Sequence, residues 1–488
     1  MRLFRARILI AVYICAFLFY SFPSLPPEST ASAVPAPKLN VLFIISDDLR
    51  PELGAYGNKI IKTPNIDGLA ARGMRFDRAY AQFPLCNPSR SSLLNGRYPT
   101  QTGVMDNNTY FRAKHPDFVT LPQYFKQHGY ATLRTGKIFH GGIDDELSWT
   151  EGGEPPDPKI INRPPSRIAT GAAPSDQPET ANQGRTPNPN ESASDRMVVL
   201  NDDGQSHGDY KVATRAIQYL ERYKDKPFFL AVGFVKPHSP PTAPQKFFDL
   251  YDPEKIPLPA DFATRPAAPP GFPEISISKR NADLFIGRDA SPKEAREMIR
   301  AYYASTSFMD AQVGRVIEAL DRLGLRENTI LVFWGDHGYH LGEKGKWSKA
   351  YSLFDIALRV PLIVAVPQSK AQVSGRTVQL LDMYPTLAEL CGLPPPRNID
   401  GHSFAPLLKD PNAAWSYPAF SVTLFQGKLG RSVRTERWHY VEWDDGKAGA
   451  MLCDTVNDPH ELNNVVADPA NAKTVLEMKK LLKQLPER

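Results

Sequence analysis

The stretch Asn40-Val41-Leu42-Phe43-Ile44-Ile45-Ser46-Asp47-Asp48 decides the fold class of this chain. Its apolar run is unbroken, rich in β-branched residues, and ends abruptly at a serine and two aspartates. A strand with one face in water alternates between apolar and polar residues, whereas a continuously apolar strand is typical of a sheet that is covered on both faces. The stretch therefore predicts a buried strand that carries polar residues at its carboxyl end.

Comparable apolar runs recur along the chain, and several of them also end at ionisable residues. The runs are 130–135, 228–234, 329–334 and 360–366, and the polar ends are Gly136-Lys137, Lys236-Pro237-His238 and Gly335-Asp336-His337. A helical pattern runs from Ala295 to Leu323 and is closed by Gly324. This alternation predicts an α/β domain with a large, mostly parallel sheet between helices, and such sheets place their sites at the carboxyl ends of the strands.

The pattern of apolar and polar residues changes after about Pro411. Short alternating strands are expected at 419–425, 430–435 and 438–443, followed by a last helix at 472–485. We therefore expect a main domain over 34–412 and a smaller C-terminal antiparallel-sheet domain over 413–488. Two proline-rich segments within the main domain, 152–195 and 261–287, are expected to be exposed insertions.

The first 33 residues have the composition of a secretory signal peptide. Arg2, Arg5 and Arg7 precede an apolar run from Ile8 to Tyr20, and Ala31-Ser32-Ala33 offers a cleavage site. The alternative is a membrane anchor, but this run is too short to span about 30 Å of hydrocarbon as a helix. We expect an exported protein (periplasmic, extracellular or lysosomal) without a stable membrane span.

Charge and cysteine content narrow the class of protein further. The chain has 488 residues with 58 Lys+Arg against 53 Asp+Glu, so its net charge of +5 argues against a nucleic-acid-binding protein. After removal of the signal peptide three cysteines remain, Cys86, Cys391 and Cys453, too few for a disulfide scaffold. Cys391 and Cys453 could form one bridge, which would leave Cys86 as the odd thiol.

The two acidic strand ends are candidates for a metal site. Asp47 and Asp48 repel each other, and Asp336-His337 follows another buried strand, so the arrangement needs a counter-charge. Oxygen ligands favour a hard divalent cation, Ca²⁺ or Mg²⁺. The alternative is that these acids only cap the helices that follow.

The segment Cys86-Asn87-Pro88-Ser89-Arg90, followed by Leu94-Asn95-Gly96-Arg97, resembles the signature of the type I sulfatases. In that family the cysteine is oxidised after translation to formylglycine. Asn95 departs from the family pattern, which usually has Thr or Ser there. Other family-like stretches are Asn40 to Asp48, Thr63 to Asp67, Gly73 to Phe76, Gly136 to His140 and Asp458 to Asn464.

Further details are similar to the iduronate-2-sulfatase branch of the family. They are Leu121 to Lys126, Lys137 to His140, Val235 to His238, His340 to Glu343 and Trp347 to Lys349. The segment from Lys349 to Asp355 is one residue longer than the branch pattern, so the local loop is expected to differ. The resemblance implies an alkaline-phosphatase-like fold, with 34–412 as the catalytic sulfatase domain.

The resemblance also implies roles for individual residues. Asp47, Asp48, Asp336 and His337 would hold Ca²⁺ or Mg²⁺ together with the formylglycine made from Cys86, whose hydrated form attacks sulfur. The resemblance implies that Arg90 and His140 contact the formylglycine. It implies that Lys137, His238 and Lys349 bind the sulfate, and that His238 also donates a proton to the departing oxygen.

The implied partners are a sulfated saccharide substrate and a formylglycine-generating or sulfatase-maturating enzyme. The implied substrate is a sulfated glycan or uronic acid, with Lys349 placed to meet a sugar carboxylate or the sulfate. Two other interpretations stay open: a phosphomonoester or phosphonate hydrolase of the same superfamily, and a non-catalytic secreted glycan-binding relative.

Overall fold

The computed structural model of the chain describes residues 38–161 and 195–487. The predicted signal peptide, 1–33, lies outside the described residues, as does most of the insertion expected at 152–195. The described residues form one compact unit. Among the described residues, no helix is both long enough and apolar enough to cross a membrane.

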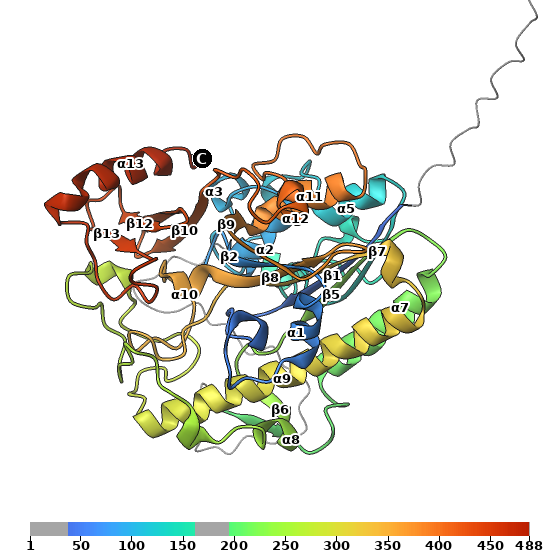
Figure 1. Ribbon diagram of the computed structural model, residues 1–488, viewed down its shortest axis with the longest axis horizontal. Coiled ribbons are helices and arrows are strands. Elements are labelled where there is room, and N and C mark those ends of the chain that lie inside the picture. Colours follow the sequence, from blue (N-terminus) through green and yellow to red (C-terminus); the bar gives the residue numbers. More distant parts are fainter. Residues whose placement is uncertain (1–37, 162–194, 488) are drawn as a thin grey trace, which may run out of the picture. The chain divides into compact units, whose positions relative to one another are not determined.

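A seven-stranded, mostly parallel sheet forms the centre of this unit (Figure 1), as the apolar runs predict. Its strand order is β3-β5-β1-β7-β8-β2-β9, in which β8 is antiparallel to both of its neighbours and every other pair is parallel. The strands are β1 (Asn40–Ser46), β2 (Met74–Tyr80), β3 (Ala131–Gly136), β5 (Phe228–Phe234), β7 (Thr329–Gly335), β8 (Arg359–Ala365) and β9 (Gln372–Gln379).

Helices cover both faces of the sheet. For this reason the sequence of strand β1 does not alternate between apolar and polar residues. Val41, Phe43 and Ile45 pack into one apolar core, whereas Leu42 and Ile44 pack into another on the opposite face. The first core includes side chains of α2 (Cys86–Asn95), α5 (Leu121–Gln127), α11 (Met383–Leu390) and α12 (Ala405–Lys409). The second includes side chains of α1 (Pro64–Ala70), α7 (Gly208–Tyr223) and α9 (Pro292–Arg322).

The long helix α9 confirms the pattern read from 295 to 323, with an earlier start. Ser291 accepts a hydrogen bond from the Glu294 backbone N–H, the Glu294 side chain accepts in return from Ser291, and Pro292 occupies the first turn. Because this capping box precedes the apolar pattern, the helix begins at Pro292.

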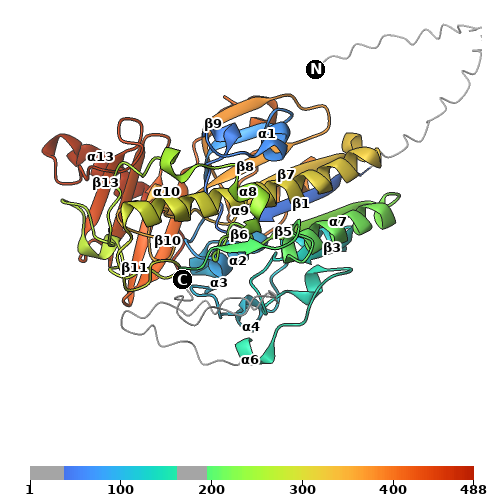
Figure 2. The same cartoon turned by 90° about the horizontal axis from the view of Figure 1, so that it is seen from below.

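The C-terminal region forms the predicted smaller antiparallel sheet. Its order is β10-β11-β12-β13, with β10 (Ala419–Phe425), β11 (Lys428–Arg434), β12 (Trp438–Trp443) and β13 (Ala450–Asp454). Helix α13 (Ala472–Leu482) packs Met478 and Leu482 against this sheet. Figures 1 and 2 place this sheet at the end of the central sheet toward which β1 runs. The domain boundary at 412/413 stays a prediction.

The remaining elements are short. They are η1 (Gly54–Tyr56), α3 (Pro99–Thr102), α4 (Phe111–Lys114), η2 (Glu146–Ser148), α6 (Pro158–Ile161), β4 (Val198–Leu200), β6 (Thr242–Pro244), α8 (Gln245–Phe248), η4 (Pro253–Lys255), η5 (Glu274–Ser276), η6 (Arg326–Asn328), α10 (Asp355–Leu358), η7 (Leu380–Asp382) and η8 (Pro469–Asn471). Strands β4 and β6 form a separate parallel pair.

The expectation that 261–287 is an exposed insertion is wrong. Ile277, Leu284 and Phe285 in this segment are buried, and the Phe285 ring lies 4.9 Å from that of Trp347. The prolines fix the turns of this segment, while the apolar residues between them supply packing contacts.

The suggested disulfide between Cys391 and Cys453 is also absent from the structure. Both are free thiols, as is Cys86. Cys453 is a residue of β13 and is buried in an apolar core, whereas Cys391 ends helix α11 beside the carbonyl of Leu39.

A buried ionic cluster ties the family-like segment 458–464 to the rest of the chain. Glu461 contacts Arg434 and His439 at 2.7 and 2.5 Å, and its second oxygen accepts a hydrogen bond from the backbone N–H of Asp355. Burial disfavours the ionised carboxylate, but His439 and Arg434 outweigh it and lower the pKa of Glu461 to about 2. The segment therefore stabilises the junction of the C-terminal sheet with α10.

We predict that Glu461→Gln lowers the free energy of unfolding at pH 7 by about 3–5 kcal/mol, because Arg434 loses its buried counter-charge. Since the folded pKa is depressed, the carboxylate's contribution is complete above its unfolded pKa near 4.3 and fades as pH falls toward 2. Denaturant unfolding at several pH values should therefore show the gap between the two proteins closing in acid. A gap that is constant down to pH 3 would contradict this assignment.

Candidate functional site

An acidic pair, Asp47-Asp48, and an acid–imidazole pair, Asp336-His337, meet at the carboxyl ends of β1 and β7. Because Ser46 at the end of β1 is in register with Gly335 at the end of β7, the residues that follow lie side by side. The Asp336 carboxylate accepts a hydrogen bond from the backbone N–H of Asp48 at 3.1 Å, although the two residues are far apart in the chain. The strand order thus brings together the acids that the sequence placed at separate strand ends.

The turn after β1 holds Asp48 in an unusual backbone conformation. Its φ is 60°, in the left-handed region that non-glycine residues seldom occupy. The hydroxyl of Tyr302 on α9 donates a hydrogen bond to the Asp48 carbonyl at 2.8 Å and accepts one from the backbone N–H of Arg50. Such strain persists where the surroundings fix the backbone, and it aims the Asp48 carboxylate at the same point as that of Asp47.

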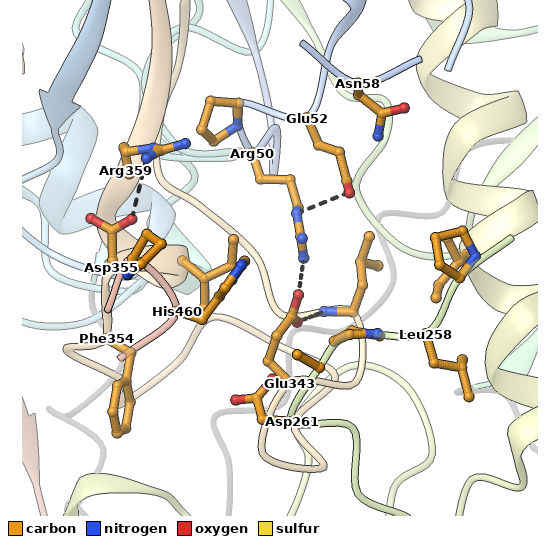
Figure 3. Close-up of a pocket in the computed structure, with 18 of the residues that line it drawn as sticks. Arg50, Glu52, Asn58, Leu258, Asp261, Glu343, Phe354, Asp355, Arg359 and His460 are labelled. Atoms are coloured by element: carbon orange, nitrogen blue, oxygen red, sulfur yellow. Dashed lines mark hydrogen bonds and ion pairs between the residues drawn. The ribbon is translucent and has the colours of Figure 1, made fainter. Parts of the chain in front are cut away.

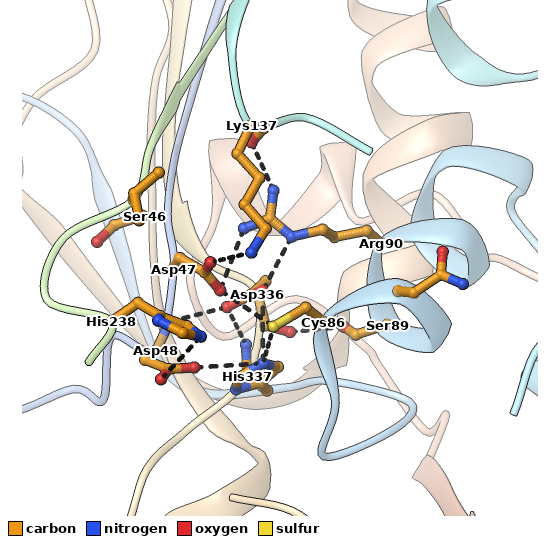
Figure 4. Close-up of polar contacts among 12 residues, drawn as sticks. Ser46, Asp47, Asp48, Cys86, Ser89, Arg90, Lys137, His238, Asp336 and His337 are labelled. Atoms are coloured by element: carbon orange, nitrogen blue, oxygen red, sulfur yellow. Dashed lines mark hydrogen bonds and ion pairs between the residues drawn. The ribbon is translucent and has the colours of Figure 1, made fainter. Parts of the chain in front are cut away.

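Cys86 lies at the first position of α2 and is completely buried. Its Sγ is 3.3 Å from Asp47 Oδ1 and 3.2 Å from His337 Nε2 (Figure 4). Asp47, Asp48, Cys86 and His337 offer ligand atoms that all lie within 4.8 Å of one another. Asp336 lies beside this quartet, with Oδ2 at 3.5 Å from His337 Nε2.

Arg90 lies one helical turn after Cys86 and points into the same cluster. Its guanidinium is fully buried and donates to Asp336 Oδ2 at 2.9 Å and to the carbonyl of Lys137 at 2.5 Å. It also contacts Asp47 at 3.4 Å. One cation therefore joins α2 to the loops after β1, β3 and β7.

Three further predicted residues approach the aspartates from other loops. Lys137 Nζ lies 2.7 Å from Asp47, and Lys349 Nζ lies 3.0 Å from Asp48. His238 Nε2 is 3.9 Å from Asp48, while its Nδ1 is 2.8 Å from the carbonyl of Ser239. His140 follows Lys137 in the loop after β3 and is half-buried; its role stays a prediction.

The electrostatics of the two neighbouring carboxylates differ. Burial would raise the pKa of Asp47, but Lys137 and Arg90 outweigh it and hold that pKa well below the usual range. For Asp48, burial together with the charges of neighbouring carboxylates outweighs Lys349 and raises the pKa well above the usual range. The cations of the protein thus do not compensate the ionised form of Asp48, which a divalent cation would stabilise.

Burial has a similar effect on the thiol. It raises the pKa of Cys86, and the nearby charge of Asp47 raises it further. A thiol beside carboxylates is a poor thiolate nucleophile. The donor set of carboxylate oxygens with one imidazole suits Ca²⁺ or Mg²⁺ better when the sulfur is replaced by oxygen.

Sequence reasoning missed two buried residues behind Lys349. Asp283 Oδ2 lies 3.5 Å from Lys349 Nζ, and the charge of Asp283 also acts on the fully buried Lys346, whose pKa burial lowers to about 8. Asp283 belongs to the proline-rich segment that was expected to be exposed. Neither spacing nor a motif marks these two residues.

A cavity of about 500 Å³ begins two residues beyond Asp48, at Arg50 (Figure 3). Arg50 pairs with Glu52 at 3.1 Å and with Glu343 at 2.8 Å, and Arg359 lies 3.7 Å from Asp355. Because both arginines are already paired with carboxylates of the cavity wall, we assign no ligand to this cavity.

A mixed, mostly parallel sheet with such a cluster at its strand ends defines an alkaline-phosphatase-like hydrolase. Residues 39–393 match the family described as Sulfatase, and residues 342–488 match the C-terminal region described as N-sulphoglucosamine sulphohydrolase. The chain belongs to the sulfatase family and is a sulfuric ester hydrolase.

Individual relatives agree with this assignment. The chain is 38% identical to the iduronate 2-sulfatases of Mus musculus and Homo sapiens, over 74% of this chain and 70% of each relative. It is 32% identical to a sulfatase of Formosa agariphila, over 88% of this chain and 83% of the relative.

Solved structures share the fold. An enzyme bound to its substrate D-glucosamine-2-N,6-O-disulfate has a TM-score of 0.71 at 22% identity, covering 92% of this chain and 97% of that chain. The phosphonate monoester hydrolase of Agrobacterium radiobacter has a TM-score of 0.71 at 24% identity, covering 92% and 95%.

Proposed function

We propose that this protein hydrolyses O-sulfate esters on a sulfated glycan, and in particular on a sulfated uronic acid, with a formylglycine made from Cys86 and a bound divalent cation. The observation that carries the proposal is the position of the Cys86 side chain between Asp47 and His337, with Arg90 and Lys137 completing the cluster. The similarity to iduronate 2-sulfatases supports the uronate.

The residues present fit both groups. Asp47, Asp48, Asp336 and His337 would hold Ca²⁺ or Mg²⁺, and an oxygen-bearing side chain at position 86 would complete a hard donor set. A hydrated formylglycine would supply a hydroxyl able to attack sulfur and a second hydroxyl through which sulfate could be released, and the cation would supply Lewis-acid chemistry that favours the ionised hydroxyl and polarises the ester.

The chain's own residues bind and orient the substrate. Arg90 is locked by Asp336 and the Lys137 carbonyl, so its guanidinium holds the side chain at position 86 in one orientation. Lys137 supplies fixed positive charge for the sulfate oxygens, and Lys349 supplies it for the uronate carboxylate or for the sulfate, in a site where burial strengthens electrostatic contacts. His140 is proposed to contact the modified side chain from the loop after β3.

His238 is the proposed proton donor to the departing sugar oxygen. With Nδ1 directed at the Ser239 carbonyl, its Nε2 faces the cluster beside Asp48. A proton held at Nε2 is thus on the side of the ring where the leaving oxygen would lie.

A phosphomonoester or phosphonate hydrolase is the alternative within the same fold, which the Agrobacterium radiobacter enzyme shares. Steady-state kinetics on a matched aryl sulfate and aryl phosphate tests it. A higher kcat/KM on the phosphate would overturn the proposed substrate class. A non-catalytic glycan-binding protein would show no turnover of either ester.

Export and maturation belong to the same proposal. A formylglycine-generating or sulfatase-maturating enzyme is the required partner, and the N-terminal segment would direct the chain out of the cytoplasm. N-terminal sequencing of the mature protein tests this, and a start near Val34 is the expected result.

We predict that Lys349→Ala lowers kcat/KM for a 2-sulfated uronate about ten- to hundredfold more than for an aryl sulfate, because only the uronate carries a carboxylate that a buried ammonium can bind. Steady-state kinetics of both substrates measures this difference. Lys137→Ala is the matched control, since Lys137 faces Asp47 and should affect both esters alike. Equal losses in Lys349→Ala would remove the support for the uronate and leave the sulfatase assignment intact.

A further inference from the structure

We propose that a surface pocket of about 430 Å³, between the segment 274–280 and the hairpin of β10 and β11, binds a second, anionic sugar unit of the substrate. This inference rests on the proposed function and extends it from a single sulfated sugar to an oligosaccharide. The pocket is lined by Glu274, Ile275, Ile277, Ser278, Lys279, Arg280, Phe425, Gln426, Lys428 and Ala448.

The pocket combines an apolar floor with a surplus of positive charge. Ile275, Ile277 and Phe425 line the pocket and are largely buried, so they form an apolar floor over which the C–H face of a sugar ring could lie. Lys279 is paired with Glu274 at 3.2 Å. Arg280 and Lys428 are exposed, and no carboxylate among the described residues pairs with either of them.

The segment that forms one wall of the pocket leads along the chain into the candidate active site. Arg280 is followed by Asn281, which is buried and accepts a hydrogen bond from the backbone N–H of Trp347 at 2.8 Å. Asp283, two residues further, contacts Lys349. Three residues span at most about 10 Å, so the backbone of Arg280 lies no further than this from that of Asp283, whose side chain contacts Lys349.

The opposite wall is anchored to the same loop. The ring of Tyr351, which follows Lys349 by two residues, stacks on Phe425 with centroids 4.7 Å apart. Phe425 is directly paired with Lys428 across the hairpin, so the two side chains share one face of the sheet. The hairpin turn at Gln426 and Gly427 has positive φ at both residues, which makes it short and well defined.

Both walls therefore connect the two unpaired cations to the loop that carries Lys349. A monosaccharide bound at Cys86 would not extend to these cations, whereas an oligosaccharide would place its next unit over the apolar floor. Because guanidinium and ammonium groups bind carboxylate and sulfate alike, the expected occupant is a sugar that carries either anion.

The test compares the double variant Arg280→Gln/Lys428→Gln with the wild type on a sulfated uronate-containing tetrasaccharide, the corresponding monosaccharide and an aryl sulfate. The wild type should prefer the tetrasaccharide in kcat/KM. The double variant should lower the ratio of tetrasaccharide to aryl sulfate kcat/KM about three- to thirtyfold, mainly through KM, and added salt should diminish the difference. A tetrasaccharide without its second anionic group should lose the same advantage.

The matched control is Lys224→Gln/Lys370→Gln, which removes two exposed cations on other parts of the surface and should leave that ratio unchanged. If the wild type cleaves the aryl sulfate but shows no preference for the tetrasaccharide, or if both double variants behave alike, the pocket is not a sugar subsite and the proposed sulfatase function stands. If the wild type cleaves no sulfate ester, the proposed function fails and this extension fails with it.

Discussion

Replacing Cys86 by alanine should reduce kcat on any sulfate ester by roughly five orders of magnitude or more, which is the scale of losing a catalytic nucleophile. The expectation follows from the position of Cys86 Sγ, which contacts both Asp47 and His337 at the centre of the cluster. Cys391→Ala is the control, because Cys391 ends α11 beside Leu39 and should retain wild-type turnover.

Mass spectrometry of the native protein separates this mechanism from a thiol mechanism. The peptide that contains Cys86 should have the mass expected when an aldehyde replaces CH₂SH, together with a hydrated form. Cys86→Ser should lose turnover as fully as the alanine variant, because a serine sulfate ester has no internal route to release sulfate. Fully active enzyme whose Cys86 is found only as a free thiol would refute the proposal.

Asp47→Asn should lower kcat/KM about a thousandfold while the central sheet stays folded, and Asp336→Asn should do the same. A cation that stabilises charge in the transition state contributes several kcal/mol, and each 1.36 kcal/mol is a factor of ten. Circular dichroism and steady-state kinetics together measure fold and activity. Asp382→Asn is the matched control, because Asp382 is equally buried but accepts hydrogen bonds from backbone groups outside the cluster.

Metal removal gives the corresponding test on the wild type. Chelation should inactivate the enzyme, and Ca²⁺ or Mg²⁺ should restore activity better than Zn²⁺, because the donors are mainly hard oxygens. If the protein stays fully active after exhaustive chelation and elemental analysis finds no bound metal, the proposed metal site is wrong.

The central sheet and most of the candidate site could be predicted from the sequence because both depend on strand ends. Continuous apolar runs such as Asn40 to Ser46 indicate strands covered on both faces, and the residues that follow them meet at one edge. The pairing of Ser46 with Gly335 brings Asp47-Asp48 and Asp336-His337 into one cluster.

The parts that could not be predicted depend on tertiary packing. Asp283 lies in a segment whose prolines are typical of an exposed loop, and only the folded chain shows it buried against Lys349. The thiols of Cys391 and Cys453 could not be placed from their number alone, because pairing requires proximity. Lys346 carries no local pattern that distinguishes it from a surface lysine.

The complete burial of Cys86 has a consequence for how such an enzyme is made. Once α2 has packed against the central sheet, no second protein can reach the thiol, so the proposed conversion of this residue would have to come before the chain closes around it. The proposed maturation would therefore have to be complete before folding is. A cell that exports this chain without converting it in time would accumulate a stable, correctly folded and permanently inert protein, and later exposure to the maturation enzyme would not rescue it unless the fold were first opened.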